Sequence, residues 1–232
     1  MTTRVPTRPT AHQQEAAAAS RRAPRAHRLA PSHPVLAHLL RRGIEAKPTE
    51  PDLPFPPGLD LARADRFGEM LGSYAFRLFL RGAILKPRGF RPAEATRYLE
   101  ADQAGHFAAE LCSLGLAARL PRGRCRLLRA ARSFGGTLEW YVARELERRL
   151  GFAALTGLSW RARGVGGDLD VAAVADGRLV YLELKSGPPK HLSTSEVACF
   201  VDRVRALRPD VALLVLDTSL RLSDKVLPML VA

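Results

Sequence analysis

Residues 167–185 read GDLDVAAVADGRLVYLELK. Two apolar runs flank Asp176-Gly177, and an Asp-Gly pair between such runs predicts a β-hairpin with a two-residue type I′ turn. A two-residue turn fixes the register of the strands, and counting outward from it places Asp170 opposite Glu183. Side chains that face each other directly across a hairpin are about 4.5–5.5 Å apart at Cβ. Two like charges at that distance repel, so the pattern favours a site in which a cation lies between them.

Lys185 extends this pattern. Glu183 and Lys185 are two positions apart, so their side chains share one face of the strand. The hairpin register places the side chain of Asp170 on the same face. Carboxylate oxygens suit Mg²⁺ or Mn²⁺ and argue against zinc. A hard divalent ion held by carboxylates is a common device of phosphoryl chemistry. The same register places Asp168 opposite Lys185, which leaves one alternative open: a salt-bridged hairpin in a structural interaction protein.

The helix predicted from Thr137 to Gly151 carries a third acid of interest. At about 100° per residue, Glu139 lies roughly 40° from the centre of the apolar stripe, whereas Glu145 and Glu147 lie farther away. A carboxylate on a core-facing stripe is costly to bury unless it is paired or binds a metal. The alternative is a glutamate at the margin of the helix contact. The stripe consists of Leu138, Val142, Leu146 and Leu150.

The ordered set of motifs resembles a known family. Residues 167–170, followed thirteen positions later by Glu183-Leu184-Lys185, resemble the PD-(D/E)xK superfamily of restriction-endonuclease-like nucleases, in particular its Holliday-junction-resolvase-like members. The resemblance covers residues 134–218, about a third of the chain. The chain departs from the family name in having Leu169 where the name has proline. A nuclease is therefore one expectation for residues 133–232.

This resemblance implies a fold and a set of roles. The fold is α/β, with a restriction-endonuclease-like αβββαβ core whose first strand we expect near residues 158–163. Asp170 and Glu183 would bind Mg²⁺ or Mn²⁺, and Glu139 would hold a second metal or a metal-bound water. Lys185 would orient or deprotonate the attacking water and stabilise developing charge.

The remaining elements of the core have clear local signals. Ser193 and Glu196 form a capping box, which predicts the start of a helix. Pro209 ends that helix, because proline cannot continue it. Residues 211–216 are a continuous apolar run, as expected of a buried parallel strand.

Residues 61–132 predict a second, α+β unit. Apolar residues recur at helical spacing from Phe67 to Leu78, Pro92 opens a short helix, and a third helix is expected near residues 102–114. A hairpin follows, turning at residues 121–123. Three helices and a hairpin resemble a winged helix-turn-helix domain. The third helix exposes no Lys or Arg, so we expect the unit as a whole to bind the nucleic-acid backbone, or a protein, rather than to read bases.

The hairpin of this unit is rich in arginine. Arg122, Arg124 and Arg126 alternate with smaller or apolar residues, which predicts one arginine-lined face, and Arg119 adds a charge across the hairpin. A row of arginines on a protruding ribbon suits contact with phosphates. The alternative is a solvated face without a partner.

The charge is uneven along the chain. The formal net charge is +13. Residues 61–135 hold 14 Lys and Arg against 6 acids, whereas residues 136–232 hold 13 against 12. A basic excess points to a polyanionic partner. Because the excess is concentrated in residues 61–135, we expect these residues to bind nucleic acid. Residues 1–60 are basic and rich in proline, so we expect a disordered tail and linker, with at most a short helix over 34–42, and expect the first 55 residues to be dispensable for folding.

The composition also bears on compartment and assembly. The three cysteines are widely spaced and form no zinc pattern, which indicates reduced thiols in a cytoplasmic protein. No apolar run approaches the roughly 20 residues of a membrane span, so no membrane partner is expected. A homodimer is allowed by the sequence but not required.

The sequence therefore predicts a metal-dependent nuclease that hydrolyses nucleic-acid phosphodiester bonds, with DNA favoured over RNA. The alternative function is a winged-helix nucleic-acid-binding or regulatory protein whose nuclease-like domain does not cut. The intact set of Asp170, Glu183 and Lys185 argues against that alternative.

Overall fold

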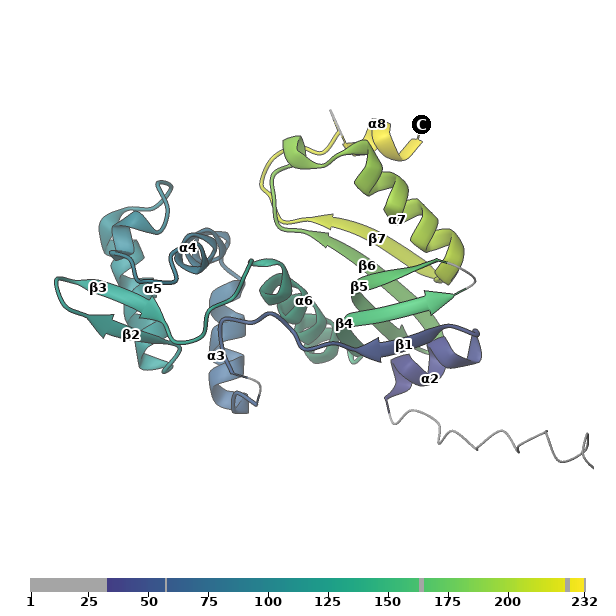
Figure 1. Ribbon diagram of the computed structural model, residues 1–232, viewed down its shortest axis with the longest axis horizontal. Coiled ribbons are helices and arrows are strands. Elements are labelled where there is room, and N and C mark those ends of the chain that lie inside the picture. Colours follow the sequence, from purple (N-terminus) through teal and green to yellow (C-terminus); the bar gives the residue numbers. More distant parts are fainter. Residues whose placement is uncertain (1–32, 57, 163–164, 224–225, 232) are drawn as a thin grey trace, which may run out of the picture. The chain divides into compact units, whose positions relative to one another are not determined.

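The computed structural model describes residues 33–56, 58–162, 165–223 and 226–231 (Figure 1). They belong to one compact unit, and the segment from Met1 to Pro31 lies outside them. The expectation of a disordered tail can therefore be compared with the structure only from residue 33 onward. No helix among the described residues is long and apolar enough to cross a membrane.

A five-stranded mixed sheet is the centre of the C-terminal part. Its strand order is β1-β4-β5-β6-β7, in which only β6 and β7 run parallel to each other. The chain order from residue 135 to residue 216 is α6, β4, β5, β6, α7, β7. This is the predicted αβββαβ order, and the α/β class is confirmed. The strands of the sheet are β1 (Glu45–Pro48), β4 (Ala153–Ala162), β5 (Val165–Ala175), β6 (Arg178–Lys185) and β7 (Val211–Leu216).

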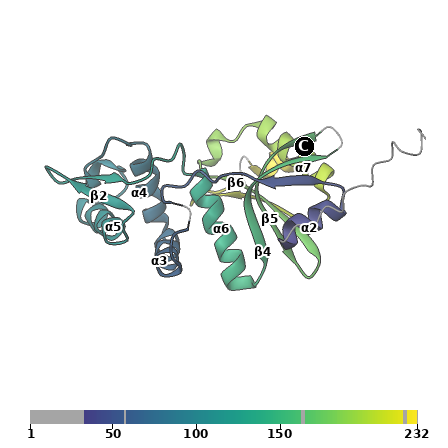
Figure 2. The ribbon, with the colours of Figure 1, turned by 60° about the horizontal axis from the view of Figure 1, so that its bottom comes forward.

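Helices cover both faces of this sheet. α6 (Gly135–Leu150) contributes Leu138 to a hydrophobic cluster that includes Val171 and Leu182 of the sheet. α7 (Thr194–Leu207) contributes Phe200 to a separate cluster that includes Tyr181. Neighbouring residues of a strand point to opposite faces, so α6 and α7 pack on opposite sides, as Figure 2 shows.

The predicted hairpin forms with the predicted turn. Asp176 and Gly177 have φ values of 49° and 71°, and a type I′ turn requires positive φ at both positions. Pairing runs outward from Ala175–Arg178 and ends at Val171–Leu182. The register is therefore right as far as the ladder extends. The predicted ladder pairs Asp170–Glu183 and Asp168–Lys185 do not form, and Asp168 pairs with Ser159 of β4.

The strand geometry is interrupted around Asp170. Leu169 and Ala172 are three positions apart and yet lie in the same hydrophobic cluster, whereas regular alternation would put them on opposite faces. On β4 the residue across from this point is Gly157, with a φ of +56°. Glycine adopts this left-handed conformation without steric cost. The kink explains why counting along a regular strand does not locate the Asp170 side chain.

Residues 33–56 are more ordered than expected of a linker. α2 (Pro34–Arg41) buries Val35 and Leu39 completely. β1 then pairs with β4 and extends the sheet at one edge. The short helix expected over residues 34–42 forms as α2. The expectation of a disordered linker is wrong for β1, because this four-residue strand pairs with β4 far along the chain.

The segment from residue 61 to residue 127 contains three α-helices followed by a hairpin. The expected first helix is divided at Gly72–Ser73, because the Ser73 side chain caps the start of a new helix. The helix expected at Pro92 is one 3₁₀ turn. The elements here are α3 (Leu61–Leu71), α4 (Tyr74–Ile84), η1 (Pro92–Glu94), α5 (Ala101–Ser113), β2 (Ala117–Leu120) and β3 (Arg124–Leu127).

This segment and the sheet share one hydrophobic core. A single cluster contains Phe67 and Phe79 of the helices together with Leu138 of α6 and Leu184 of β6. The secondary-structure pattern therefore changes near residue 132, but buried side chains from both sides of this boundary belong to the same hydrophobic cluster.

The C-terminal elements complete the sheet. β7 is parallel to β6 as predicted. The expectation that it is buried is wrong, because it is an edge strand on which Val211 and Leu213 are 43% and 45% exposed. The last elements are the 3₁₀ turn η2 (Pro189–His191) and α8 (Val226–Val231).

Candidate active site

The candidate site lies where β5 and β6 separate. Beyond the last ladder pair, the Oδ2 atom of Asp170 accepts a hydrogen bond from the main-chain N–H of Leu184 at 2.7 Å. A buried strand N–H needs an acceptor, and here the carboxylate supplies it. The side chain of Asp170 is thereby fixed at the fork between the two strands.

Glu183 is buried, with 4% of its surface exposed, and it is surrounded by donors. Its Oε2 atom accepts a hydrogen bond from Arg203 Nη1 at 2.6 Å and another from the hydroxyl of Tyr181. Its Oε1 atom is 3.1 Å from Lys185 Nζ. Burial alone would raise the pKa of Glu183, but the hydrogen bond from Tyr181 and the charges of Arg203 and Lys185 outweigh it and lower that pKa.

Lys185 bridges two acids. Its Nζ atom is 3.1 Å from Glu183 Oε1 and 3.3 Å from Glu196 Oε1. Glu196 belongs to the capping box with Ser193 that starts α7, as predicted. Burial favours the neutral amine, but these carboxylates outweigh it and raise the pKa of Lys185. The side chain is therefore a fixed cation beside Glu183.

Glu139 lies in the first turns of α6, partly buried, as the apolar stripe predicts. It forms no hydrogen bond or ion pair with any residue that the structure describes. Burial, followed by repulsion from Asp170 and Glu183, raises its pKa to about 8. A partly buried acid whose pKa is raised by neighbouring acids is a candidate member of a functional site.

Asp170 shows the same effect less strongly. Burial and then the charge of Glu183 raise its pKa to about 6, although the Leu184 N–H and the nearby Lys185 act in the opposite direction. The charges of Asp170 and Glu183 act on Glu139, and the charge of Glu183 acts on Asp170.

The donor chemistry of these acids fits Mg²⁺ or Mn²⁺. Carboxylate oxygens are the ligands that these hard ions prefer, and a cation would relieve the repulsion that raises two of the three pKa values. As the side chains stand, no three His, Cys, Asp or Glu residues in the described parts of the chain are close enough together to hold an ion. Binding would therefore require these carboxylates to converge.

Comparison with known proteins supports the fold alone. Neither a protein-family model nor a curated protein matches the sequence. The crystal structure of protein VC1899 from Vibrio cholerae is similar, with a TM-score of 0.50 and 17% identity over 82% of this chain and 53% of that one. Can2 from Sulfobacillus thermosulfidooxidans, solved in complex with cyclic tetra-adenylate, has a TM-score of 0.44 and 16% identity over 75% of this chain and 47% of its own. The chain thus spans about half the length of each structure.

Arg203 and Tyr181 belong to the site and were not predicted. Arg203 is one helical turn after Phe200, at the margin of the apolar face of α7. A charged residue in such a position is the same signal that marks Glu139 on α6. Tyr181 shares a strand face with Glu183, so its hydroxyl is placed by the two-residue period of β6.

Asp168 differs from its three acidic neighbours. It is exposed and pairs with Ser159 of β4. Lys185 binds Glu183 and Glu196 instead of Asp168. The alternative of an Asp168–Lys185 salt bridge in a purely structural hairpin therefore lacks its expected contact.

The hairpin β2–β3 carries the four predicted basic residues. Arg124 and Arg126 are exposed and alternate with buried Cys125, as the strand period predicts. Arg122 lies in the turn, with a φ of 61°. Arg119 pairs with Cys125 and therefore lies on the face opposite to Arg124 and Arg126. The expected row of four charges is thus divided between the turn and both faces.

One of these arginines already has partners in the protein. The guanidinium of Arg124 donates hydrogen bonds to the main-chain carbonyls of Arg88 at 3.2 Å and Gly89 at 2.9 Å. Its side chain fixes the loop before η1 to the hairpin. Arg122 and Arg126 are the better candidates for contact with a phosphate backbone.

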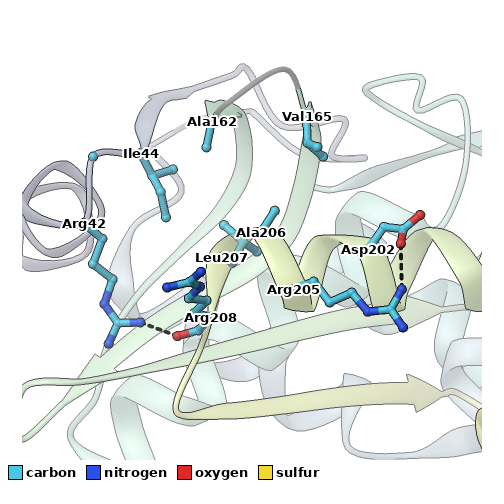
Figure 3. A pocket seen from close by; sticks show the side chains of 10 residues that line it. Arg42, Ile44, Ala162, Val165, Asp202, Arg205, Ala206, Leu207 and Arg208 are labelled. Carbon is cyan, nitrogen blue, oxygen red and sulfur yellow. Dashed lines mark hydrogen bonds and ion pairs between the residues drawn. The ribbon is translucent and has the colours of Figure 1, made fainter.

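One cleft lies away from Glu139, Asp170 and Glu183. It measures about 680 Å³, and Figure 3 shows Arg42, Arg205 and Arg208 around it. Arg205 is paired with Asp202, and Arg42 bonds the main-chain carbonyl of Arg208. None of the groups with strongly shifted pKa values lines this cleft. The chemistry therefore points to the fork between β5 and β6.

Proposed function

We propose that the chain is a metal-dependent nuclease of the PD-(D/E)xK type that hydrolyses phosphodiester bonds in nucleic acid, with DNA favoured over RNA. One observation carries the proposal. Glu139 and Asp170 are partly buried and have pKa values raised to about 8 and about 6, in part by the charge of Glu183, and neither has a cationic side chain bound to it among the described residues. Such a group of acids beside Lys185 is suited to a divalent cation.

The acids have distinct roles in this proposal. Asp170 and Glu183 would hold Mg²⁺ or Mn²⁺, and Glu139 would hold a second ion. The bound ion would act as a Lewis acid toward the phosphate and make water a better nucleophile at neutral pH. Asp170 is held by the Leu184 N–H, so one ligand is oriented before the ion arrives.

Lys185 acts through its charge. Because the neighbouring carboxylates raise its pKa, it remains an ammonium ion at neutral pH. It would orient the attacking water and stabilise charge that develops on the phosphate, and it would not remove a proton. Of the two roles expected from the sequence, the structure supports the electrostatic one.

Residues 61–132, which we propose as a winged-helix-like domain, would grip the nucleic acid. The charge excess of the chain is concentrated there, and Arg122 and Arg126 are exposed on a hairpin. Exposed arginines bind phosphates without reading sequence.

A cleavage assay on DNA and RNA in duplex, single-stranded and branched forms, with and without Mn²⁺, tests the proposal. We expect Asp170→Asn to abolish cleavage and Lys185→Ala to reduce it by roughly 100-fold or more. Asp168→Asn is the matched control, since that carboxylate is exposed on the same strand. If Asp168→Asn abolishes cleavage while Asp170→Asn does not, the assignment of the ligands is wrong.

One observation favours the alternative of a nucleic-acid-binding protein that does not cut. The described acids do not converge on a common point, and Glu183 is already bound by Arg203. The thermal stability of the chain upon addition of Mn²⁺ separates the two functions, because a ligand that binds only the native state stabilises it. No stabilisation and no cleavage would leave the non-cutting alternative.

A further inference from the structure

α7 contacts β6 through two successive pairs of residues. The ring of Phe200 stacks on that of Tyr181 with centroids 5.8 Å apart, and Arg203 then binds Glu183. Residues three apart on a helix lie on one face, and residues two apart on a strand share a face. The two spacings match, so the packing of Phe200 brings the arginine to the carboxylate.

The donors around Glu183 are distributed unevenly between its two oxygens. A carboxylate oxygen can accept about two hydrogen bonds. Oε2 receives both the Tyr181 hydroxyl and Arg203 Nη1, so its acceptor sites are filled. Oε1 has Lys185 Nζ at 3.1 Å and one acceptor site left. Oε1 is therefore the oxygen that remains available to a cation.

The burial of Glu183 makes these partners necessary. An ionised carboxylate without partners is strongly disfavoured in the protein interior, and Glu183 is only 4% exposed. The side chain of Arg203 is itself 23% exposed, so α7 supplies the charge from a partly solvated position. The rigid planar guanidinium also fixes the rotation of the carboxylate better than a flexible ammonium group would.

We propose that Arg203, assisted by Tyr181, is a positioning residue for the metal site: it holds Glu183 in the orientation in which Oε1 serves as the ligand. The inference rests on the proposed function, because it assigns Glu183 to a divalent cation. It adds a residue on α7 that does not itself touch the ion or the substrate.

Removal of Arg203 would change the affinity for the cation in opposite directions through its charge and through its orienting of Glu183. Arg203 is a positive charge near the proposed ion, so its loss would strengthen cation binding if charge alone mattered. Loss of orientation would weaken binding, because Glu183 would no longer be held as a ligand. The sign of the change in affinity therefore distinguishes a positioning residue from a competitor.

The experiment is a Mn²⁺ titration of the full-length chain without nucleic acid, followed by the electron paramagnetic resonance signal of free Mn²⁺. We expect Arg203→Met to weaken Mn²⁺ binding roughly 10- to 100-fold, as is usual when a partner of a metal ligand is removed. Arg203→Lys should recover part of the affinity, and Tyr181→Phe should lower it less. Arg205→Met is the matched control. Arg205 lies on the same helix, is 76% exposed and pairs with Asp202 (Figure 3), so this variant should bind Mn²⁺ as tightly as the wild type does.

The outcomes separate the two proposals. If the wild type binds Mn²⁺ and Arg203→Met binds it equally or more tightly, the positioning role is overturned while the proposed function stands. If the wild type binds no Mn²⁺, the proposed function and this inference fail together. Should Arg203→Met not fold, as judged by circular dichroism, Arg203→Lys and Tyr181→Phe provide the test, and unchanged affinity in both would overturn the inference.

Discussion

Glu139 is the residue at which burial and repulsion combine most strongly. Its pKa in the folded protein is about 8, above the ordinary value of 4.5. Between these values the folded protein holds a proton that the unfolded chain has released, so stability falls as the pH rises from about 4.5 to about 8. Asp170 contributes in the same direction between its ordinary 3.8 and about 6.

Glu139→Gln should therefore stabilise the metal-free protein at high pH, because glutamine cannot ionise. In a chelating buffer at pH 8.5 we expect a melting temperature about 5 °C above that of the wild type, and at pH 4 we expect no difference. Glu147→Gln, at an exposed position of the same helix, should change neither value. Equal melting temperatures of Glu139→Gln and wild type at pH 8.5 would show that Glu139 is not repelled in the native state.

α2 and β1 show how a short element gains its stability from packing. Leu39 is fully buried and its neighbour Leu40 is 39% exposed. Leu39→Ala should lower the free energy of unfolding by about 2–5 kcal/mol, the usual cost of a cavity in a core. Leu40→Ala should cost far less. Urea denaturation measures both, and similar small losses would mean that α2 does not pack on the sheet in solution.

The arginine hairpin is the second element with a measurable role. Replacing Arg122 and Arg126 by alanine should weaken nucleic-acid binding and reduce the slope of log affinity against log salt by roughly 2, about one ion for each phosphate that the protein no longer neutralises. Arg119→Ala should have a smaller effect, because Arg119 lies on the opposite face. A mobility-shift titration at several salt concentrations measures the slopes. An unchanged slope in the double variant would remove the hairpin from the interface.

The whole described unit is held together by a shared core and by a buried ion-pair cluster. Asp217, which follows β7, is 8% exposed and accepts hydrogen bonds from Arg77 at 3.0 Å and from Arg81, both on α4. Its main-chain N–H also bonds the carbonyl of Lys185 at 2.8 Å. The helical segment is therefore tied to the strand ends beside the candidate site.

Asp217→Asn should destabilise the protein as one body. Removing one member of a buried ion pair costs about 3–5 kcal/mol, because the remaining charges lose their partner. We expect calorimetry to show a single transition in the wild type and a single transition at lower temperature in the variant. Two separate transitions, of which only one shifts, would show that residues 61–132 and 133–232 unfold independently.

The sequence alone determined the features that depend on near neighbours in the chain. The Asp176-Gly177 turn fixes the hairpin register because its backbone angles are local. Glu139 was located by the helical period, and the start of α7 by the Ser193–Glu196 capping box. These signals give the αβββαβ order, and three of the four predicted site residues follow from them without knowledge of the packing: Glu139, Glu183 and Lys185.

Tertiary structure decided what depends on residues far apart in sequence. The ladder ends before Asp170 because β5 kinks opposite Gly157, and regular alternation cannot foresee that kink. Arg203 reaches Glu183 only because α7 packs on β6 through Phe200. β1 is four residues ending in proline and has no strand signal of its own; it is a strand because β4, more than 100 residues later, supplies its hydrogen-bond partners.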